Sequence, residues 1–176
     1  MVIKQVMAAV AVAFLSGCGG KAVIESDMSR LVAASPSSPW LTVDDNGQKV
    51  LVVPGLASKE KVQVTPGVAA AVESRLRREL QPKYFTDLII NCRKLEASAS
   101  VAAEAEPPTA GLDLSMNCHI VARGLSSSRA YRVHESLPVQ PAAPHLERVV
   151  PALLEGASKQ LADQLWADVL ATGVKR

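Results

Sequence analysis

The sequence predicts an α+β fold of two layers, in which two helices pack on one face of an antiparallel sheet of about four strands, in the order β-α-β-β-β-α. Residues 112–120 alternate apolar and polar side chains, which is typical of a strand with one buried face. Residues 65–80 and 144–171 place apolar side chains at helical spacing. A length of 176 residues and a hydrophobic content of 48% are sufficient for a single domain with its own core.

The overall composition argues against one class of partner. The chain carries 19 Lys and Arg against 17 Asp and Glu, a net charge of +2, whereas nucleic-acid-binding domains usually carry a strong basic excess. Aromatic residues make up 3% of the chain, which is too few for a base-stacking surface. We therefore expect no nucleic-acid partner.

The first 17 residues have the pattern of a secretory signal peptide. A basic start with Lys4 precedes an apolar stretch over 6–15 that is too short to span a bilayer. The sequence Leu-Ser-Gly-Cys at 15–18 then resembles the lipobox of bacterial lipoproteins. The resemblance implies that Cys18 carries a lipid as a thioether and that residues 1–17 are removed. An ordinary secretory peptide whose cleavage site happens to precede a Cys is the alternative.

The residue after Cys18 bears on the location. In lipoproteins of this kind an Asp in that place favours retention in the inner membrane, and here the residue is Gly19. The resemblance therefore implies an outer-membrane protein, anchored by its acyl chains and facing the periplasm. Residues 18–39, which contain Gly-Gly and Ser-Pro sequences, are expected to form a lipidated tether with one or two helical turns near Ile24, and 40–176 to form the domain.

Cysteine usage predicts one disulfide. The chain has three Cys, and lipidation of Cys18 leaves Cys92 and Cys118 in an oxidising compartment, where such a pair usually joins. If these two lie opposite each other on neighbouring strands, Ile90 lies opposite Ile120 and the apolar faces coincide. Two buried free thiols are the alternative.

The first half of the domain is expected to hold a hairpin and a helix. Residues 44–47 (Asp-Asp-Asn-Gly) form a turn signal between strands at 40–43 and 49–53. The helix is expected to begin with Thr65 as N-cap and Pro66 in its first turn. It would bury one stripe of apolar side chains, formed by Ala69, Val72, Leu76 and Leu80.

Three strands are expected next, over 86–101, 112–123 and 129–139. In the first of them the apolar positions change parity after Cys92. One extra residue would reconcile the two halves, so we predict a β-bulge near Arg93 and Lys94.

The connection to the third of these strands is expected at Ser126-Ser127, which sets Ile120 opposite Val133 and joins two apolar faces. A longer loop around Gly124 is the alternative. The same pairing places Glu135 on the apolar face, which counts against it.

The chain ends in a long amphipathic helix over 144–171. Pro151 inside it removes a backbone hydrogen bond and predicts either a kink or a helix start. Gly173 stands where a C-terminal cap belongs.

This layout resembles the YajG-type outer-membrane lipoproteins. The matching features are the lipobox, the helix at 65–80, the sequence Asp-Leu-Ile-Ile at 87–90, the hairpin at 112–139 and the C-terminal helix. The resemblance covers roughly 48–170 as a pattern of elements and implies an envelope lipoprotein without an established reaction. A lipopolysaccharide-assembly lipoprotein has a related outline, so an accessory role in lipid or lipopolysaccharide assembly is the alternative.

The sequence contains none of the common catalytic motifs, such as a P-loop, GxGxxG, HExxH or GxSxG. No nucleophile is visibly paired with a base, so we expect neither an enzyme nor a cofactor.

Two sets of residues are candidate sites. His119 and His134 would face each other on the wet side of the sheet, as a weak metal or pH-sensing pair that lacks a third ligand, or simply as two surface histidines. Four arginines would share the same side, either as a solvated face or as a patch for anionic lipid headgroups or an acidic partner. They are Arg93, Arg123, Arg129 and Arg132.

The sequence therefore predicts a lipid-anchored envelope protein that binds or scaffolds a partner protein. Lipidation would confine the domain near the membrane and raise its effective concentration there.

Overall fold

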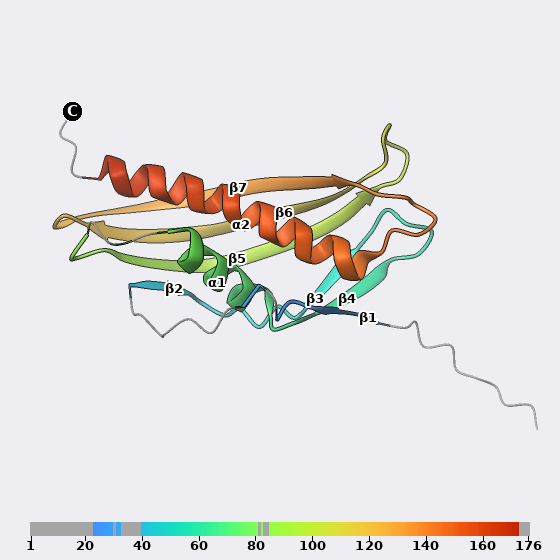
Figure 1. Ribbon diagram of the computed structural model, residues 1–176, viewed down its shortest axis with the longest axis horizontal. Coiled ribbons are helices and arrows are strands. Elements are labelled where there is room, and N and C mark those ends of the chain that lie inside the picture. Colours follow the sequence, from blue (N-terminus) through green and yellow to red (C-terminus); the bar gives the residue numbers. More distant parts are fainter. Residues whose placement is uncertain (1–22, 30, 33–39, 81, 83–84, 173–176) are drawn as a thin grey trace, which may run out of the picture.

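The computed structural model describes residues 23–29, 31–32, 40–80, 82 and 85–172. The predicted signal peptide, Cys18 and the predicted cap at Gly173 lie outside these residues. Within the described part of the chain, two helices and seven strands in two sheets form an elongated α+β fold (Figure 1). The predicted fold class is confirmed.

The larger sheet has the strand order β2-β5-β6-β7. Its long strands β5 (Ile89–Ala102), β6 (Thr109–Ala122) and β7 (Leu125–Pro138) are antiparallel neighbours of 14 residues each. The short β2 (Leu41–Val43) adds to β5 in parallel, where the sequence indicated a purely antiparallel sheet. Helices α1 (Val68–Glu79) and α2 (Leu146–Ala171) lie on one face of this sheet and leave the other open (Figure 1).

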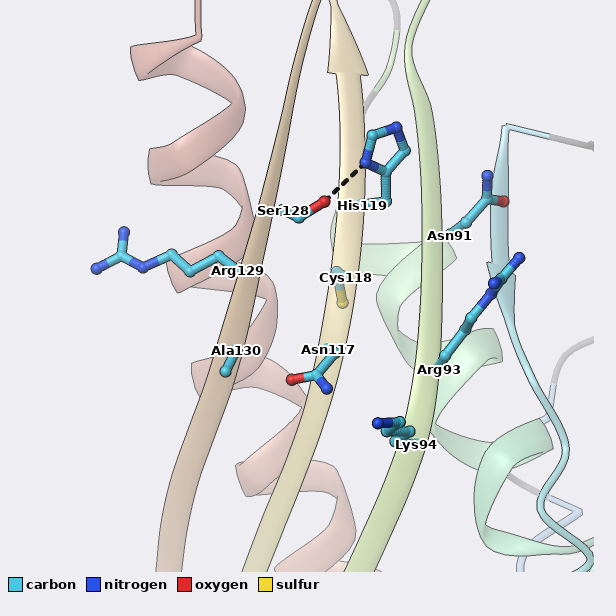
Figure 2. Close-up of a pocket in the computed structure, with 9 residues that line it drawn as sticks. All are labelled: Asn91, Arg93, Lys94, Asn117, Cys118, His119, Ser128, Arg129 and Ala130. Carbon is cyan, nitrogen blue, oxygen red and sulfur yellow. Dashed lines mark hydrogen bonds between the residues drawn. The ribbon is translucent and has the colours of Figure 1, made fainter.

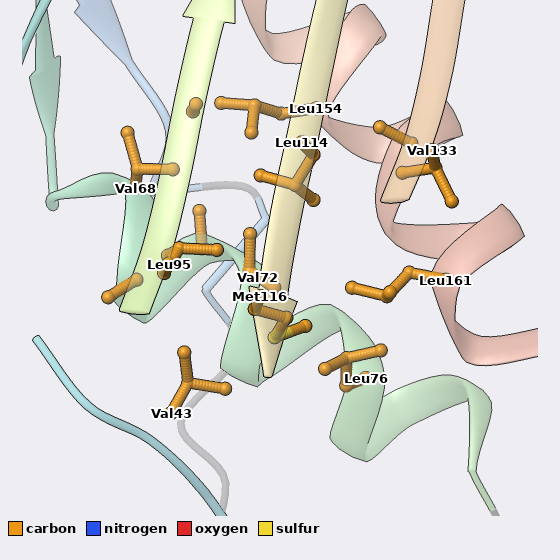
Figure 3. Close-up of a cluster of buried hydrophobic side chains, with 14 of the residues drawn as sticks. Val43, Val68, Val72, Leu76, Leu95, Leu114, Met116, Val133, Leu154 and Leu161 are labelled. Carbon is orange, nitrogen blue, oxygen red and sulfur yellow. The ribbon is translucent and has the colours of Figure 1, made fainter. Parts of the chain in front are cut away.

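The core between these layers is aliphatic. Figure 3 shows side chains of β5 and β6 meeting those of both helices. Leu95, Met116, Leu76 and Leu161 are each at most 2% exposed. All four residues of the predicted α1 stripe, from Ala69 to Leu80, are buried as well.

A smaller sheet has the order β1-β4-β3. It consists of β1 (Ile24–Asp27), β4 (Glu60–Thr65) and β3 (Val50–Val53), with β1 parallel and β3 antiparallel to β4. The sequence pattern predicted neither β1 nor β4 as a strand.

The expected hairpin at 44–47 is wrong, because β2 and β3 belong to different sheets. The turn itself forms, since the side chains of Asp45 and Asn46 accept the backbone N–H groups of Gly47 and Gln48 at 2.8 and 3.0 Å. The Gln48 side chain then exchanges hydrogen bonds with the backbone of Ala97 on β5, which leads the chain away from β2.

The expected tether at 18–39 also needs correction, because it contains β1. Glu25 and Asp27 are exposed and alternate with the buried Ser26 and Met28, so the period is that of a strand and not of helical turns. Met28 is fully buried in the core. The folded domain therefore begins at least as early as Ile24.

The predicted disulfide joins Cys92 to Cys118, with Ile90 opposite Ile120 as expected. The predicted bulge is confirmed as well, because the β5–β6 register shifts between Arg93 and Glu96.

The expected pairing of β6 with β7 is wrong in register. Arg123 and Gly124, both at positive φ, make a two-residue turn, so Ile120 pairs with Ser127 and not with Val133. The Asp87 carboxylate stabilises this turn by accepting the backbone N–H groups of Arg123 and Gly124 at 2.9 and 2.6 Å. The shift is six residues, an even number, so each side chain keeps its predicted face.

Helix α1 begins later than expected, with Gly67 as its N-cap. Thr65 cannot serve as the cap because it is the last residue of β4 and its carbonyl accepts the N–H of Met28 at 2.8 Å.

Helix α2 contains Pro151 and continues through it. Proline lacks the N–H that would donate to the carbonyl four residues earlier, that of Glu147. The hydroxyl of Ser26 on β1 donates to that carbonyl at 3.1 Å. A polar group of the first strand thus satisfies an acceptor that the helix leaves free.

We expect Ser26→Ala to lower the free energy of unfolding by about 1–2 kcal/mol, because it leaves the partly buried Glu147 carbonyl without a donor. In a Pro151→Ala background, where residue 151 supplies its own N–H, the same substitution should cost clearly less. Urea unfolding of the four proteins of this double-mutant cycle measures the difference. Equal losses in both backgrounds would contradict the role assigned to Ser26.

Candidate functional site

The open face of the larger sheet is polar. No helix of the described chain covers it (Figure 1), and the outward positions of its long strands carry amide, hydroxyl, imidazole and charged side chains. Among them are Asn91, Ser98, Asn117, His119, Ser128, Arg132 and His134.

A hollow of about 600 Å³ lies on this face, near the turn that joins β6 to β7. Figure 2 shows its lining, which comes from β5, β6 and β7. The lining residues are Asn91, Arg93, Lys94, Asn117, Cys118, His119, Ser128, Arg129 and Ala130.

The β-bulge gives the hollow its positive charge. Successive residues of a regular strand point to opposite faces, but Arg93 and Lys94 are both exposed. Lys94 has φ 53°, a left-handed conformation that a bulge accommodates. The sequence predicted the bulge, yet Lys94 was not among the candidate residues. The change of apolar parity at this point was the signal that could have identified it.

The charge of Arg93 is only partly offset. Its Nε lies 3.5 Å from the Asp44 carboxylate, and the two side chains are 75% and 63% exposed. An ion pair so open to solvent contributes little, so Arg93 can turn to another anion at low cost.

The expected pair of histidines is not formed. His119 Nδ1 forms a hydrogen bond with Ser128 Oγ at 2.9 Å, whereas His134 Nδ1 lies 2.9 Å from Asp113 Oδ1. Asp113 is six residues from His119 along β6, or about 20 Å. The six-residue register shift is the physical reason that the two imidazoles lie apart. Among the described residues, no three His, Cys, Asp or Glu side chains are grouped to hold a metal ion.

The His119–Ser128 pair, which the sequence did not indicate, combines a base with a hydroxyl. Nucleophilic catalysis also needs a group that orients the base and donors for the developing oxyanion. In the described part of the chain no carboxylate is hydrogen-bonded to His119, and the pair lies exposed on a strand surface. The arrangement is better suited to binding through hydrogen bonds than to acyl transfer.

The four candidate arginines do not form one patch. Arg93 and Arg132 are on the open face, but Arg129 shares the parity of the buried Tyr131 and its guanidinium binds Asp168 of α2 at 2.7 Å. In Figure 2 Arg129 and Arg93 point to opposite sides. Arg123 lies in the β6–β7 turn, with its guanidinium 5.0 Å from the centre of the Phe85 ring.

Asp168 joins β7 to α2. It accepts a hydrogen bond from the Tyr131 hydroxyl at 2.6 Å in addition to the ion pair with Arg129. Burial of the phenol, followed by this hydrogen bond, raises the pKa of Tyr131 well above its ordinary value.

Asp87 has the opposite shift. The backbone N–H groups of Gly124 and then Arg123 stabilise its carboxylate and hold its pKa below the ordinary value. The turn beside the hollow is therefore held by an ionised group.

No helix in the described part of the chain has the length and apolar character that a membrane crossing requires. No protein-family model matches the sequence, and no curated protein matches it either.

Two solved structures are similar in outline. One is a minor lipoprotein from Acinetobacter baumannii, with 14% identity, a TM-score of 0.42, and coverage of 77% of this chain and 94% of that one. The other is described as an uncharacterized protein, with 8% identity, a TM-score of 0.39, and coverage of 84% and 90%. Similarities this low assign neither a family nor a function, so the lipobox and the YajG-type resemblance stay predictions.

We expect Tyr131→Phe to lower the free energy of unfolding near neutral pH by about 1–2 kcal/mol, because it removes a hydrogen bond to a charged acceptor. The raised pKa of Tyr131 stabilises the fold fully below its unfolded value of about 10, and this contribution is lost as the pH rises through the folded value. Wild-type stability should therefore fall more steeply above about pH 10 than that of the variant. Urea unfolding at neutral and alkaline pH measures both effects, and parallel curves would contradict the assignment.

Proposed function

We propose that the protein is a lipid-anchored, non-enzymatic binding protein of the bacterial cell envelope, attached through Cys18 to the outer membrane and facing the periplasm. The leader pattern and the Leu-Ser-Gly-Cys sequence at 15–18 support the anchor. Gly19 after the Cys supports the outer membrane over the inner one.

The basic hollow on the open sheet face is the observation that carries the binding function. Arg93 and Lys94 stand side by side at its edge, and Asn117, His119 and Ser128 add hydrogen-bonding groups within it. Guanidinium and ammonium groups bind carboxylates through charge-assisted hydrogen bonds, and neighbouring neutral groups fix the orientation of the ligand.

We infer that the ligand is an acidic segment of a partner protein. The lining carries the cations Arg93 and Lys94 and no acidic side chain, which favours a ligand that presents carboxylates. A carboxylate-bearing segment needs only the cations and polar groups that the hollow supplies. The lipid anchor would raise the effective concentration of the domain near such a partner.

Replacement of the anchoring residue tests the first part of this proposal. In a bacterial host the wild-type chain should incorporate a palmitate analogue and partition into detergent, because Cys18 accepts the lipid, and Cys18→Ser should do neither. Mass spectrometry of the N-terminus identifies the acyl groups. Wild-type protein with an intact leader and no acyl chain would overturn the proposed anchor.

Charge reversal at the bulge tests the second part. We expect the double variant Arg93→Glu, Lys94→Glu to bind a fluorescent oligoglutamate peptide at least about tenfold more weakly than the parent, because two attractions become repulsions at close range. Fluorescence anisotropy of the mature chain with Cys18→Ser measures the affinity at low and at physiological salt.

The matched control is Lys49→Glu with Lys159→Glu, which makes the same change of charge at exposed positions outside the hollow. Equal losses in the two double variants would show a general charge effect and contradict the site. Binding to vesicles of phosphatidylglycerol but not to the peptide would favour the lipid alternative over an acidic protein segment.

A further inference from the structure

We propose that one end of the domain rests on the membrane that anchors Cys18, and that its contact surface consists of two uncharged loops, residues 54–58 and 139–144. These two segments are called the membrane-facing loops below. The inference rests on the lipid anchor of the proposed function and adds to it the orientation of the domain.

The position of β1 carries the first step. Ile24 pairs with Val62 in parallel, so the chain enters the domain at the same end at which β4 begins. A second hollow, of about 340 Å³, is lined by Ile24 together with residues of both membrane-facing loops, including Leu56 and Pro144. In Figure 1 the start of β1, the β3–β4 loop, the β5–β6 loop and the β7–α2 loop lie at the same end of the molecule.

The length of chain before β1 carries the second step. Six peptide steps separate Cys18 from Ile24, which allows at most about 20 Å between the lipidated residue and the sheet. A domain that began at Trp40 could stand up to about 75 Å away. The 26 residues of α2 span about 39 Å, so the anchor is shorter than the domain and holds this end close to the bilayer.

Contacts of β1 with the core hold Ile24 at the domain and so limit the chain between Cys18 and the domain to residues 19–23. Met28 is fully buried, and Ser26 is 2% exposed and bound to the Glu147 carbonyl. Peeling β1 off the domain would expose Met28 and leave that carbonyl without its donor.

The β3–β4 loop is also fixed in place. Val101 of β5 donates its N–H to the Pro54 carbonyl at 2.9 Å. Gly55, at φ 95°, lies so close to β5 that an added Cβ would be 1.7 Å from the Val101 carbonyl oxygen. This loop is therefore a firm surface and not a loose segment.

The chemistry of this end suits a lipid headgroup layer. The membrane-facing loops read Pro-Gly-Leu-Ala-Ser and Val-Gln-Pro-Ala-Ala-Pro, with no charged residue in either. Charged groups lie around the two loops: Glu25, Glu60 and Glu147 with the exposed Lys59 and Lys61. The adjacent β5–β6 loop, whose Pro108 carbonyl accepts the Val139 N–H at 2.9 Å, adds the exposed Glu104 and Glu106. The two membrane-facing loops themselves can approach the headgroups without desolvating a charge, while the surrounding carboxylates stay at the polar rim of the contact.

The opposite end of the domain points away from the bilayer. It carries the β6–β7 turn, with Arg123 and the Asp87 carboxylate, and the ion pair of Arg129 with Asp168. The basic hollow is near this turn, so it faces the periplasmic space and not the headgroups of its own membrane. That orientation suits an acidic protein partner.

Quenching of tryptophan fluorescence by brominated lipids tests the orientation. Cys92 and Cys118 are joined, so Cys18 of the mature chain can be coupled alone to a maleimide lipid in vesicles that contain brominated phosphatidylcholine. Ala57→Trp places a probe in a membrane-facing loop, and Ser126→Trp places the same probe at the distal turn; both positions are exposed. The native Trp40 and Trp166 form a common background.

We expect the emission added by Ala57→Trp to be largely quenched and that added by Ser126→Trp to be retained. Insertion of a twenty-residue Gly/Ser segment between Gly20 and Lys21 should restore the Ala57→Trp emission, because the longer linker lets this end of the domain move away from the bilayer. Equal quenching of the two probes, absence of quenching at Ala57→Trp, or quenching unchanged by the insertion would each overturn the inference. The coupling is synthetic, so this result is independent of whether cells lipidate Cys18, which the palmitate experiment decides.

Discussion

The hydroxyl of Ser26 binds the Glu147 carbonyl that Pro151 leaves free, and this contact ties the beginning of the folded chain to its last helix. It makes β1 part of the core and not of the tether, although β1 has only four residues. The small sheet, the hollow beside the β7–α2 loop and the small number of residues between Cys18 and the domain all depend on β1 being held there. A helix-breaking residue and a small polar residue 125 positions apart thus form one structural unit.

The second constraint is the single extra residue in β5. The bulge reconciles two apolar halves of opposite parity, and as a consequence it turns Arg93 and Lys94 to the same side of the sheet. The disulfide lies directly before it and fixes the register of β5 against β6. The bulge therefore lets apolar side chains of β5 pack into the core on one face of the sheet and places two cations at the hollow on the other face.

Much of the arrangement could be predicted because it depends on local patterns. Alternation gave the inward faces of the long strands, and they stayed correct even though β7 is shifted by six residues, because an even shift preserves side-chain parity. The pairing itself depended on Asp87, a residue distant in sequence that accepts the N–H groups of Arg123 and Gly124. No periodicity reports such a contact, so the separation of His119 from His134 could not be foreseen.

By itself the sequence determined the fold class, the inward faces of the long strands and helices, the bulge and the partner of Cys92, since each follows from residue spacing within one or two neighbouring segments. It also supplied the lipobox pattern, which lies outside the residues that the structure describes. Only the tertiary structure decided that Arg129 binds Asp168, that Lys94 joins Arg93, that His119 meets Ser128 and that β1 belongs to the core. These four features depend on groups that come from different strands and helices and that satisfy each other's hydrogen bonds and charges. Such groups meet only when the strands pair and the helices pack on the sheet.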